Sequence, residues 1–153
     1  MKNFIEGYVN ALTSEECAKI ISYMNEEGRL SPGRCKEPNT GRDIIFKEYK
    51  DSSDVRMDLR EENEINKIIL PSLTKCISLY TKKHPQMNNI DYWEVDHIYN
   101  LQKYNPGQGY YTSHCECCSI KTNQRILAWM FYLNTVPDGG TYFDNYELAM
   151  DAV

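Results

Sequence analysis

The sequence predicts an α+β fold in which helices come first and antiparallel strands follow. Two observations support this prediction. Before residue 91 the apolar residues of two stretches recur with a period of about 3.6, as in helices, and from Asp91 onward the period becomes about 2, as in strands. The chain has 153 residues, which suits a single domain with a core of its own. We therefore expect helices packed outside a β-sandwich or barrel.

The first helix is predicted to begin at Thr13 or Ser14. Thr13 and Glu16 have the spacing of a capping box, in which each side chain bonds the backbone N–H of the other residue. An apolar stripe with helical spacing follows, at Cys17, Ile20, Ile21 and Met24. Gly28 is a natural stop for this helix. We interpret the stripe as a packing face.

A second helical region is expected over about 58–83, where apolar residues keep helical spacing from Ile65 to Tyr80. Pro71 lies inside this region, so we expect it either to kink the helix or to begin a second one. Residues 29–56 are polar and irregular, and predict loops with one short strand at Asp43–Tyr49.

The period changes to that of a half-buried strand at Asp91, and the alternating residues are Trp93, Val95, His97, Tyr99 and Leu101. A turn is expected at 105–107, and a further strand over 109–117. Residues 125–134 are nearly all apolar, which predicts a strand that is buried on both faces or central in a sheet. A turn at 137–140 is expected to lead into residues 141–143.

Charge and hydropathy exclude several classes of protein. With 17 Lys and Arg against 22 Asp and Glu the net charge is −5, and no long basic run is present, which argues against a nucleic-acid binder. The longest apolar stretch, Ile126–Leu133, is far shorter than the ~20 residues that span a bilayer. The first residues lack the apolar core of a signal peptide. We therefore expect a cytoplasmic, reducing setting in which the six cysteines are free thiols.

The residues most suited to chemistry are His114 and Glu116. On the predicted strand, residues two positions apart point to the same face, so the imidazole and the carboxylate project together. Such a mixed nitrogen and oxygen pair can chelate one divalent metal and suits Fe(II), Mn or Zn.

The surrounding motifs point to a family. Segment 101–116 (LQKYNPGQGYYTSHCE) resembles the Y-x-P-G…Y-x-x-H-x-D segment of Fe(II)/2-oxoglutarate-dependent dioxygenases of the prolyl 4-hydroxylase type. Segment 125–134 (RILAWMFYLN) is similar to the R-x-L-T-x-x-x-Y-L-N strand of that family. Segment 138–143 (DGGTYF) is similar to its G-G-x-T-x-F hairpin, with one residue fewer. The resemblance covers roughly Glu94 to Phe143.

The resemblance implies a double-stranded β-helix, or jelly roll, flanked by N-terminal helices. It implies that His114 is the first iron ligand and Glu116 the carboxylate ligand, where the family usually has Asp. Tyr104 and Tyr132 match positions whose phenols hold 2-oxoglutarate, and Tyr111 would line the pocket beside the metal. The implied cofactors are Fe(II), 2-oxoglutarate as cosubstrate, and ascorbate. The implied reaction oxidises a C–H bond of a peptidyl proline or a small molecule with O₂ and releases succinate and CO₂.

The sequence departs from the family in its last part. The family has a second, distal His followed by a Lys or Arg, whereas His114 is the last histidine here and no Lys or Arg follows Arg125. We therefore expect a single dioxygenase domain that is truncated at its C-terminal end, with little or no turnover. Of the other histidines, His84 is expected at the surface and His97 in the core or half-buried.

Two alternatives remain open at this stage. The chain could be a non-catalytic binding or interaction module that keeps half of the oxygenase fold, as a subunit completed by another chain. Cys115, Cys117 and Cys118 also crowd around His114, and thiolates with an imidazole favour zinc. The usual second pair of cysteines is missing, so free thiols are the favoured interpretation.

Overall fold

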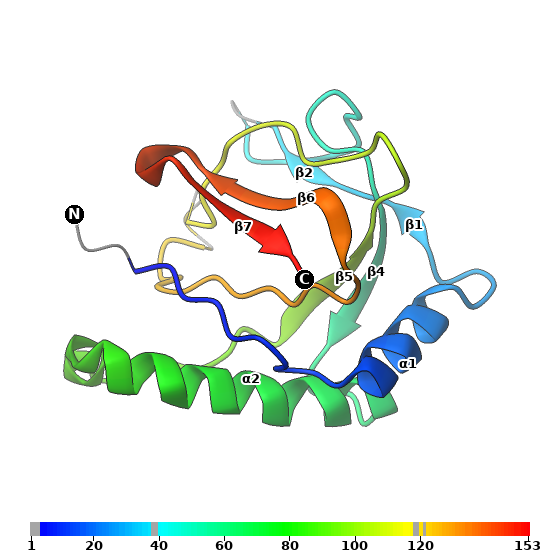
Figure 1. The fold of residues 1–153 in the computed structure, drawn as a ribbon. Coiled ribbons are helices and arrows are strands. Elements are labelled where there is room, and N and C mark those ends of the chain that lie inside the picture. Colours follow the sequence, from blue (N-terminus) through cyan, green and yellow to red (C-terminus); the bar gives the residue numbers. More distant parts are fainter. Residues whose placement is uncertain (1–3, 38–39, 118–119, 121) are drawn as a thin grey trace. The chain divides into compact units, whose positions relative to one another are not determined.

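The computed structural model describes residues 4–37, 40–117, 120 and 122–153, which form two compact units (Figure 1). The first unit combines Met1–Tyr23, Asp58–Tyr99 and Phe131–Val153, and the second combines Met24–Met57 and Asn100–Met130. The described elements are α1 (Ser14–Met24), β1 (Ser31–Pro32), β2 (Cys35–Lys36), β3 (Asp43–Ile44), β4 (Ser53–Asp58), α2 (Glu64–Lys83), η1 (Pro85–Asn89), β5 (Ile98–Lys103), β6 (Val136–Phe143), η2 (Asp144–Tyr146) and β7 (Leu148–Ala152).

Helix α1 begins with the predicted capping box. The backbone N–H of Thr13 donates to Glu16 Oε2 at 2.8 Å, and the backbone N–H of Glu16 faces Thr13 Oγ1 at 3.2 Å. Ile20 and Met24 of the apolar stripe are buried. The predicted start of this helix and its packing face are therefore confirmed.

Helix α2 is one helix, and it starts later than predicted. Asn63 is its N-cap, because Oδ1 of Asn63 accepts a hydrogen bond from the backbone N–H of Asn66 at 2.8 Å. Pro71 lies inside the helix, so the expected second helix at this position is wrong. Burial of Ile69 and Leu73 on either side of Pro71 helps to offset the backbone hydrogen bond that proline removes.

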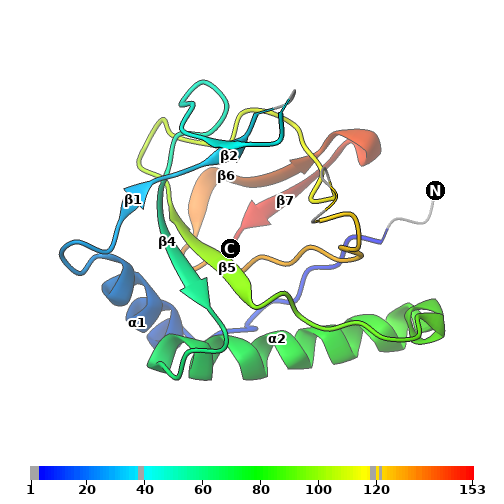
Figure 2. The same ribbon diagram turned by 180° about the vertical axis from the view of Figure 1, so that it is seen from behind.

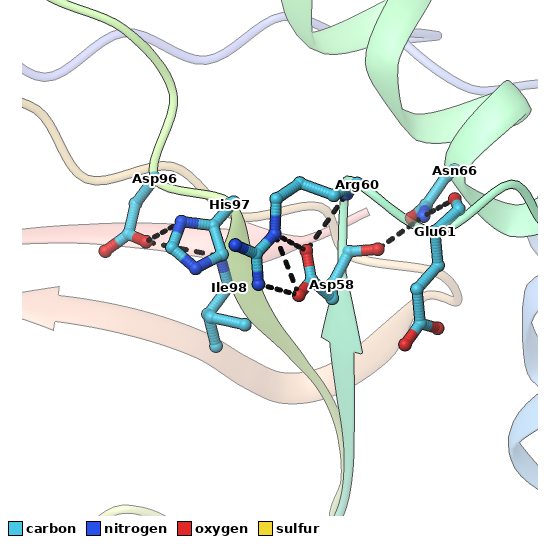
Figure 3. Close-up of polar contacts among 7 residues, drawn as sticks. All are labelled: Asp58, Arg60, Glu61, Asn66, Asp96, His97 and Ile98. Carbon is cyan, nitrogen blue, oxygen red and sulfur yellow. Dashed lines mark hydrogen bonds and ion pairs between the residues drawn. The ribbon is translucent and has the colours of Figure 1, made fainter.

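A buried amide organises the chain before α2. Asn66 is 3% exposed, and its Nδ2 donates to the backbone carbonyls of Asp58 and Glu61, both at 2.8 Å (Figure 3). On the exposed side of the same turn, Arg60 bonds both carboxylate oxygens of Asp58. The end of β4 and this turn, rather than the predicted helix, occupy residues 58–63.

Three small sheets are present in the described residues. They have the strand orders β1-β4-β5, β2-β3 and β6-β7, and β4 and β5 lie side by side in Figures 1 and 2. Strand β4 lies mostly where loops were expected. It was not predicted because one of its buried positions is the polar Asp54, which pairs with Lys50. The strand expected from Asp91 begins only at Ile98.

Two further predicted strands are not found in the described chain. Residues 109–117 hold only an isolated bridge between Lys50 and Tyr110, and residues 125–134 hold no assigned strand. Exposure still alternates along 126–131, with Ile126 46% and Met130 50% exposed, so the expected burial of both faces is wrong. The predicted turn at 137–140 lies inside β6, which pairs antiparallel with β7 through an irregularity between Val136 and Gly140.

In the first unit the N-terminal segment runs along α2 (Figure 1). The hydroxyl of Ser72 donates to the carbonyl of Ala11 at 2.6 Å, and the hydroxyl of Tyr80 donates to the carbonyl of Phe4 at 2.9 Å. His84 is fully buried between the rings of Phe4 and Tyr80, so its predicted surface position is wrong. The burial of His84 could not be predicted, because its contact partners on the N-terminal segment are distant in sequence and its own sequence neighbours are polar.

His97 also differs from its prediction. Its side chain is 49% exposed beside Asp96, because His97 precedes β5 and does not alternate within a strand.

Among the described residues no helix combines the length and apolarity that crossing a bilayer requires. The described residues form no closed barrel, and the double-stranded β-helix stays a prediction.

Candidate metal site

The two predicted metal ligands meet in the second unit. Nε2 of His114 lies 3.4 Å from Oε1 of Glu116, and the side chains are 42% and 49% exposed. Residue 112 lies in a bend, residues 116–117 lie in a turn and residues 113–115 have no regular structure, so the strand that the prediction assumed is absent here. The side chains therefore converge through local bending of the backbone.

The separation of these two atoms suits a shared cation. Two ligand atoms that each lie about 2.1 Å from a divalent metal are roughly 3.0–3.4 Å apart when the angle at the metal is about 90–110°. The 3.4 Å between the imidazole nitrogen and the carboxylate oxygen falls at the wide end of that range. Only a small adjustment would bring both atoms to one metal ion.

The other ring nitrogen of His114 is also engaged. Nδ1 lies 3.1 Å from the carbonyl oxygen of Thr112, which can only accept, so Nδ1 carries the proton. In the neutral ring this leaves the lone pair on Nε2, the atom that faces Glu116. Histidines that bind metals commonly have this second contact, which fixes the tautomer and the ring orientation.

Each member of the pair shifts the pKa of the other. The hydrogen bond to Glu116 raises the pKa of His114 despite the opposing effect of burial, and the Thr112 carbonyl adds to the increase. His114 in turn holds the pKa of the Glu116 carboxyl below its usual value. Because metal ligands must be deprotonated, a cation and a proton would compete for this pair.

Arg125 holds the second oxygen of the carboxylate. Its Nη1 lies 3.3 Å from Oε2 of Glu116, so Oε1 is the oxygen directed toward His114. Sequence analysis placed Arg125 in a family motif but gave it no contact. Each member of the pair therefore contacts one further group. The imidazole contacts the Thr112 carbonyl, and the carboxylate contacts the Arg125 guanidinium.

Tyr110 and Lys50 are site residues that sequence analysis missed. The Tyr110 ring stacks on the His114 ring, with 4.0 Å between centroids and 15° between planes. The Lys50 ammonium lies 5.7 Å from the centroid of Tyr110. Because Lys50 belongs to a polar stretch without periodicity, nothing in the sequence indicated this contact.

The three tyrosines of the resemblance occupy different surroundings. In the second unit, the Tyr104 hydroxyl donates to Gln102 Oε1 at 2.7 Å, and the Tyr111 hydroxyl donates to the Gly107 carbonyl at 2.6 Å. Burial raises the pKa of Tyr104, with further increases from Asp54 and Tyr110, although 39% of the residue is exposed. In the first unit, the Tyr132 hydroxyl bonds the Thr141 hydroxyl at 2.7 Å. The roles of these tyrosines in cosubstrate binding stay predictions.

A third metal ligand is not found in the described part of the chain, where no group of three or more His, Cys, Asp and Glu is placed to hold a metal. Cys115 and Cys117 are exposed free thiols, and Cys118 of the zinc alternative lies outside the described residues. The donor set that the structure describes is therefore one imidazole and one carboxylate.

Comparisons with models of protein families, with curated proteins and with solved structures give no match.

Proposed function

We propose that the chain contributes His114 and Glu116 to the metal site of an Fe(II)- and 2-oxoglutarate-dependent dioxygenase of the prolyl 4-hydroxylase type, on a double-stranded β-helix. The main support is the 3.4 Å between Nε2 and Oε1, combined with the contact of Nδ1 to the Thr112 carbonyl. An imidazole and a carboxylate are two of the three ligands in the facial triad of such oxygenases. The described donor set therefore fits iron in part.

In this proposal the protein residues fix the ligand geometry. His114 offers the lone pair of Nε2, and Glu116 offers Oε1 while Arg125 holds Oε2. Bound iron and 2-oxoglutarate supply the oxidation of a C–H bond by O₂, with release of succinate and CO₂. A peptidyl proline or a small molecule is the proposed substrate, and ascorbate a further cofactor.

Tyr104, Tyr132 and Tyr111 have supporting roles in this proposal. The Tyr104 phenol is protonated at neutral pH, like any tyrosine, and could donate its hydrogen bond to a carboxylate of 2-oxoglutarate instead of to Gln102. Tyr132 is the second phenol proposed for the cosubstrate, and Tyr111 the residue proposed beside the metal. We also propose a cytoplasmic, reducing compartment, in which the exposed Cys115 and Cys117 would stay free thiols.

A metal titration of the 153-residue chain tests the proposal. Co(II) serves as the spectroscopic probe for Fe(II), and its visible absorption is followed without and with 2-oxoglutarate. We expect His114→Ala and Glu116→Gln to abolish Co(II) binding at concentrations that saturate the wild type. His97→Ala is the matched control, because His97 is equally exposed beside a carboxylate, and it should bind like the wild type.

The cosubstrate gives the second measurement. We expect 2-oxoglutarate to tighten Co(II) binding and Tyr104→Phe to lose that increase. Unchanged Co(II) binding in His114→Ala would refute the metal site. Co(II) binding that 2-oxoglutarate does not affect would refute the oxygenase assignment and favour the non-catalytic module.

A further inference from the structure

We propose that Lys50 and Tyr110 are positioning residues that hold the His114 imidazole toward Glu116. The family resemblance gives neither residue a role, and the proposed roles rest on the metal site proposed above. All four residues belong to the second unit.

Tyr110 restricts the rotation of the His114 ring. The two rings are nearly parallel, at 15°, and their centroids are 4.0 Å apart. The ring edge is fixed separately by the contact of Nδ1 with the Thr112 carbonyl at 3.1 Å. With one face and one edge engaged, the orientation that remains directs Nε2 toward Glu116 Oε1.

Tyr110 is itself fixed by the backbone around Lys50. Lys50 and Tyr110 form an isolated antiparallel bridge. On either side of it, the Asp51 N–H donates to the Gly109 carbonyl at 2.9 Å, and the Tyr111 N–H donates to the Tyr49 carbonyl at 2.8 Å. The imidazole therefore rests on a ring whose own backbone is paired with a second segment.

The Lys50 ammonium adds an electrostatic contact to this pairing. It lies 5.7 Å from the Tyr110 ring centroid, within the ~6 Å range of cation–π attraction. Lys50 is 3% exposed, and its Nζ is 2.6 Å from Oδ2 of Asp54, whose Oδ1 accepts from the Ser52 hydroxyl at 2.8 Å. A buried ion pair is a weak source of stability, but it determines where the ammonium lies. Because Asp54 already neutralises it, Lys50 acts through Tyr110 rather than as a cation for an anionic ligand.

The test compares Tyr110→Leu, which removes the aromatic face, with Tyr110→Phe, which keeps it. Co(II) affinity is measured on the 153-residue chain, with thermal unfolding to establish that each variant is folded. We expect Tyr110→Leu to weaken Co(II) binding about 10- to 100-fold, the usual effect of losing a group that orients a ligand, and Tyr110→Phe to stay within about twofold. If Tyr110→Leu does not fold, Tyr110→Met and the double variant Lys50→Met/Asp54→Asn replace it, with weakened binding expected again.

A spectroscopic measurement separates positioning from general destabilisation. In the metal-free protein the Tyr110 ring current should shift the His114 ring protons upfield, and this shift should vanish in Tyr110→Leu and persist in Tyr110→Phe. Wild-type Co(II) affinity in folded Tyr110→Leu, together with lost binding in His114→Ala, refutes the positioning role and leaves the metal site standing. Wild-type affinity in His114→Ala refutes both proposals.

Discussion

The hydroxyl of Tyr99 donates a hydrogen bond to Oδ1 of Asn66 at 2.8 Å. Both residues are buried, and the amide nitrogen of Asn66 bonds two backbone carbonyls in the turn before α2. One side chain thus bonds three polar groups, the Tyr99 hydroxyl and the backbone carbonyls of Asp58 and Glu61. Burial also raises the pKa of Tyr99 to about 12, so the phenol keeps its proton and stays a hydrogen-bond donor at acid and neutral pH.

Replacement of Asn66 should therefore destabilise the protein strongly. We expect Asn66→Ala to lower the free energy of unfolding by about 2–3 kcal/mol, because it removes three hydrogen bonds made by a buried side chain. Tyr99→Phe removes only one of the three bonds and should cost about 1 kcal/mol. Urea unfolding of both variants measures the difference. Equal losses in the two variants would show that the bonds from Asn66 to the carbonyls of Asp58 and Glu61 add no stability.

The neighbouring carboxylate of Asp58 offers a direct measurement of electrostatics. Hydrogen bonds from the Arg60 side chain, and then from its backbone N–H, lower the pKa of Asp58 to about 2 (Figure 3). Arg60→Ala should raise this pKa toward the ordinary value of 3.8 without reaching it, because the backbone N–H of residue 60 remains. Carboxyl ¹³C NMR titration gives the midpoint. A midpoint that stays near 2 in Arg60→Ala contradicts the assigned cause.

Acid should loosen the contact between the N-terminal segment and α2. The hydrogen bond from Lys83, followed by that from His84, lowers the pKa of Glu6 below its ordinary value of 4.5. A lowered carboxyl pKa stabilises the fold above the unfolded-state pKa, and this contribution is lost as the pH falls through the folded-state pKa.

The variant Glu6→Gln isolates this contribution. It should be less stable than the wild type at neutral pH, and the difference should shrink as the pH falls below 4.5. Urea unfolding at neutral and acid pH measures it. Glu15→Gln is the control, because the Glu15 pair with Lys19 is exposed and should contribute little at either pH. A stability difference that does not change with pH would mean that the charge of Glu6 is not responsible.

The start of α1 followed from local sequence, and the burial of several polar side chains did not. The capping box of Thr13 and Glu16 involves neighbours in the chain, so its spacing alone predicted the start of α1. The burial of His84 depends on Phe4 and Glu6, which are distant in sequence. Asp54 is buried against Lys50, which is only four residues away but lies in a polar stretch without periodicity. Period-based prediction treats buried polar residues as exposed, and so it misses such elements.

In the candidate site, too, local sequence predicted some of the residues and not others. The sequence pattern singled out His114 and Glu116, whose side chains do meet, although the strand used to predict the contact is absent here. The groups that orient them could not be predicted, because Lys50 and Tyr110 come together only through the bridge between their segments. A short motif can thus indicate which side chains converge without indicating what supports them.

The reach of the Glu116 side chain gives a last prediction. Glu116→Asp keeps the charge but draws the carboxylate back by roughly one C–C bond, about 1.5 Å, from a position 3.4 Å from His114 Nε2. Metal–ligand distances tolerate only about 0.2 Å, so the backbone must move before both atoms bind one ion. We expect Co(II) binding to be about tenfold weaker in Glu116→Asp than in the wild type, and to be lost in Glu116→Gln, which removes the charge. Unchanged affinity in Glu116→Asp would mean that the turn around residue 116 adjusts freely, and that the contact with Arg125 does not fix the carboxylate.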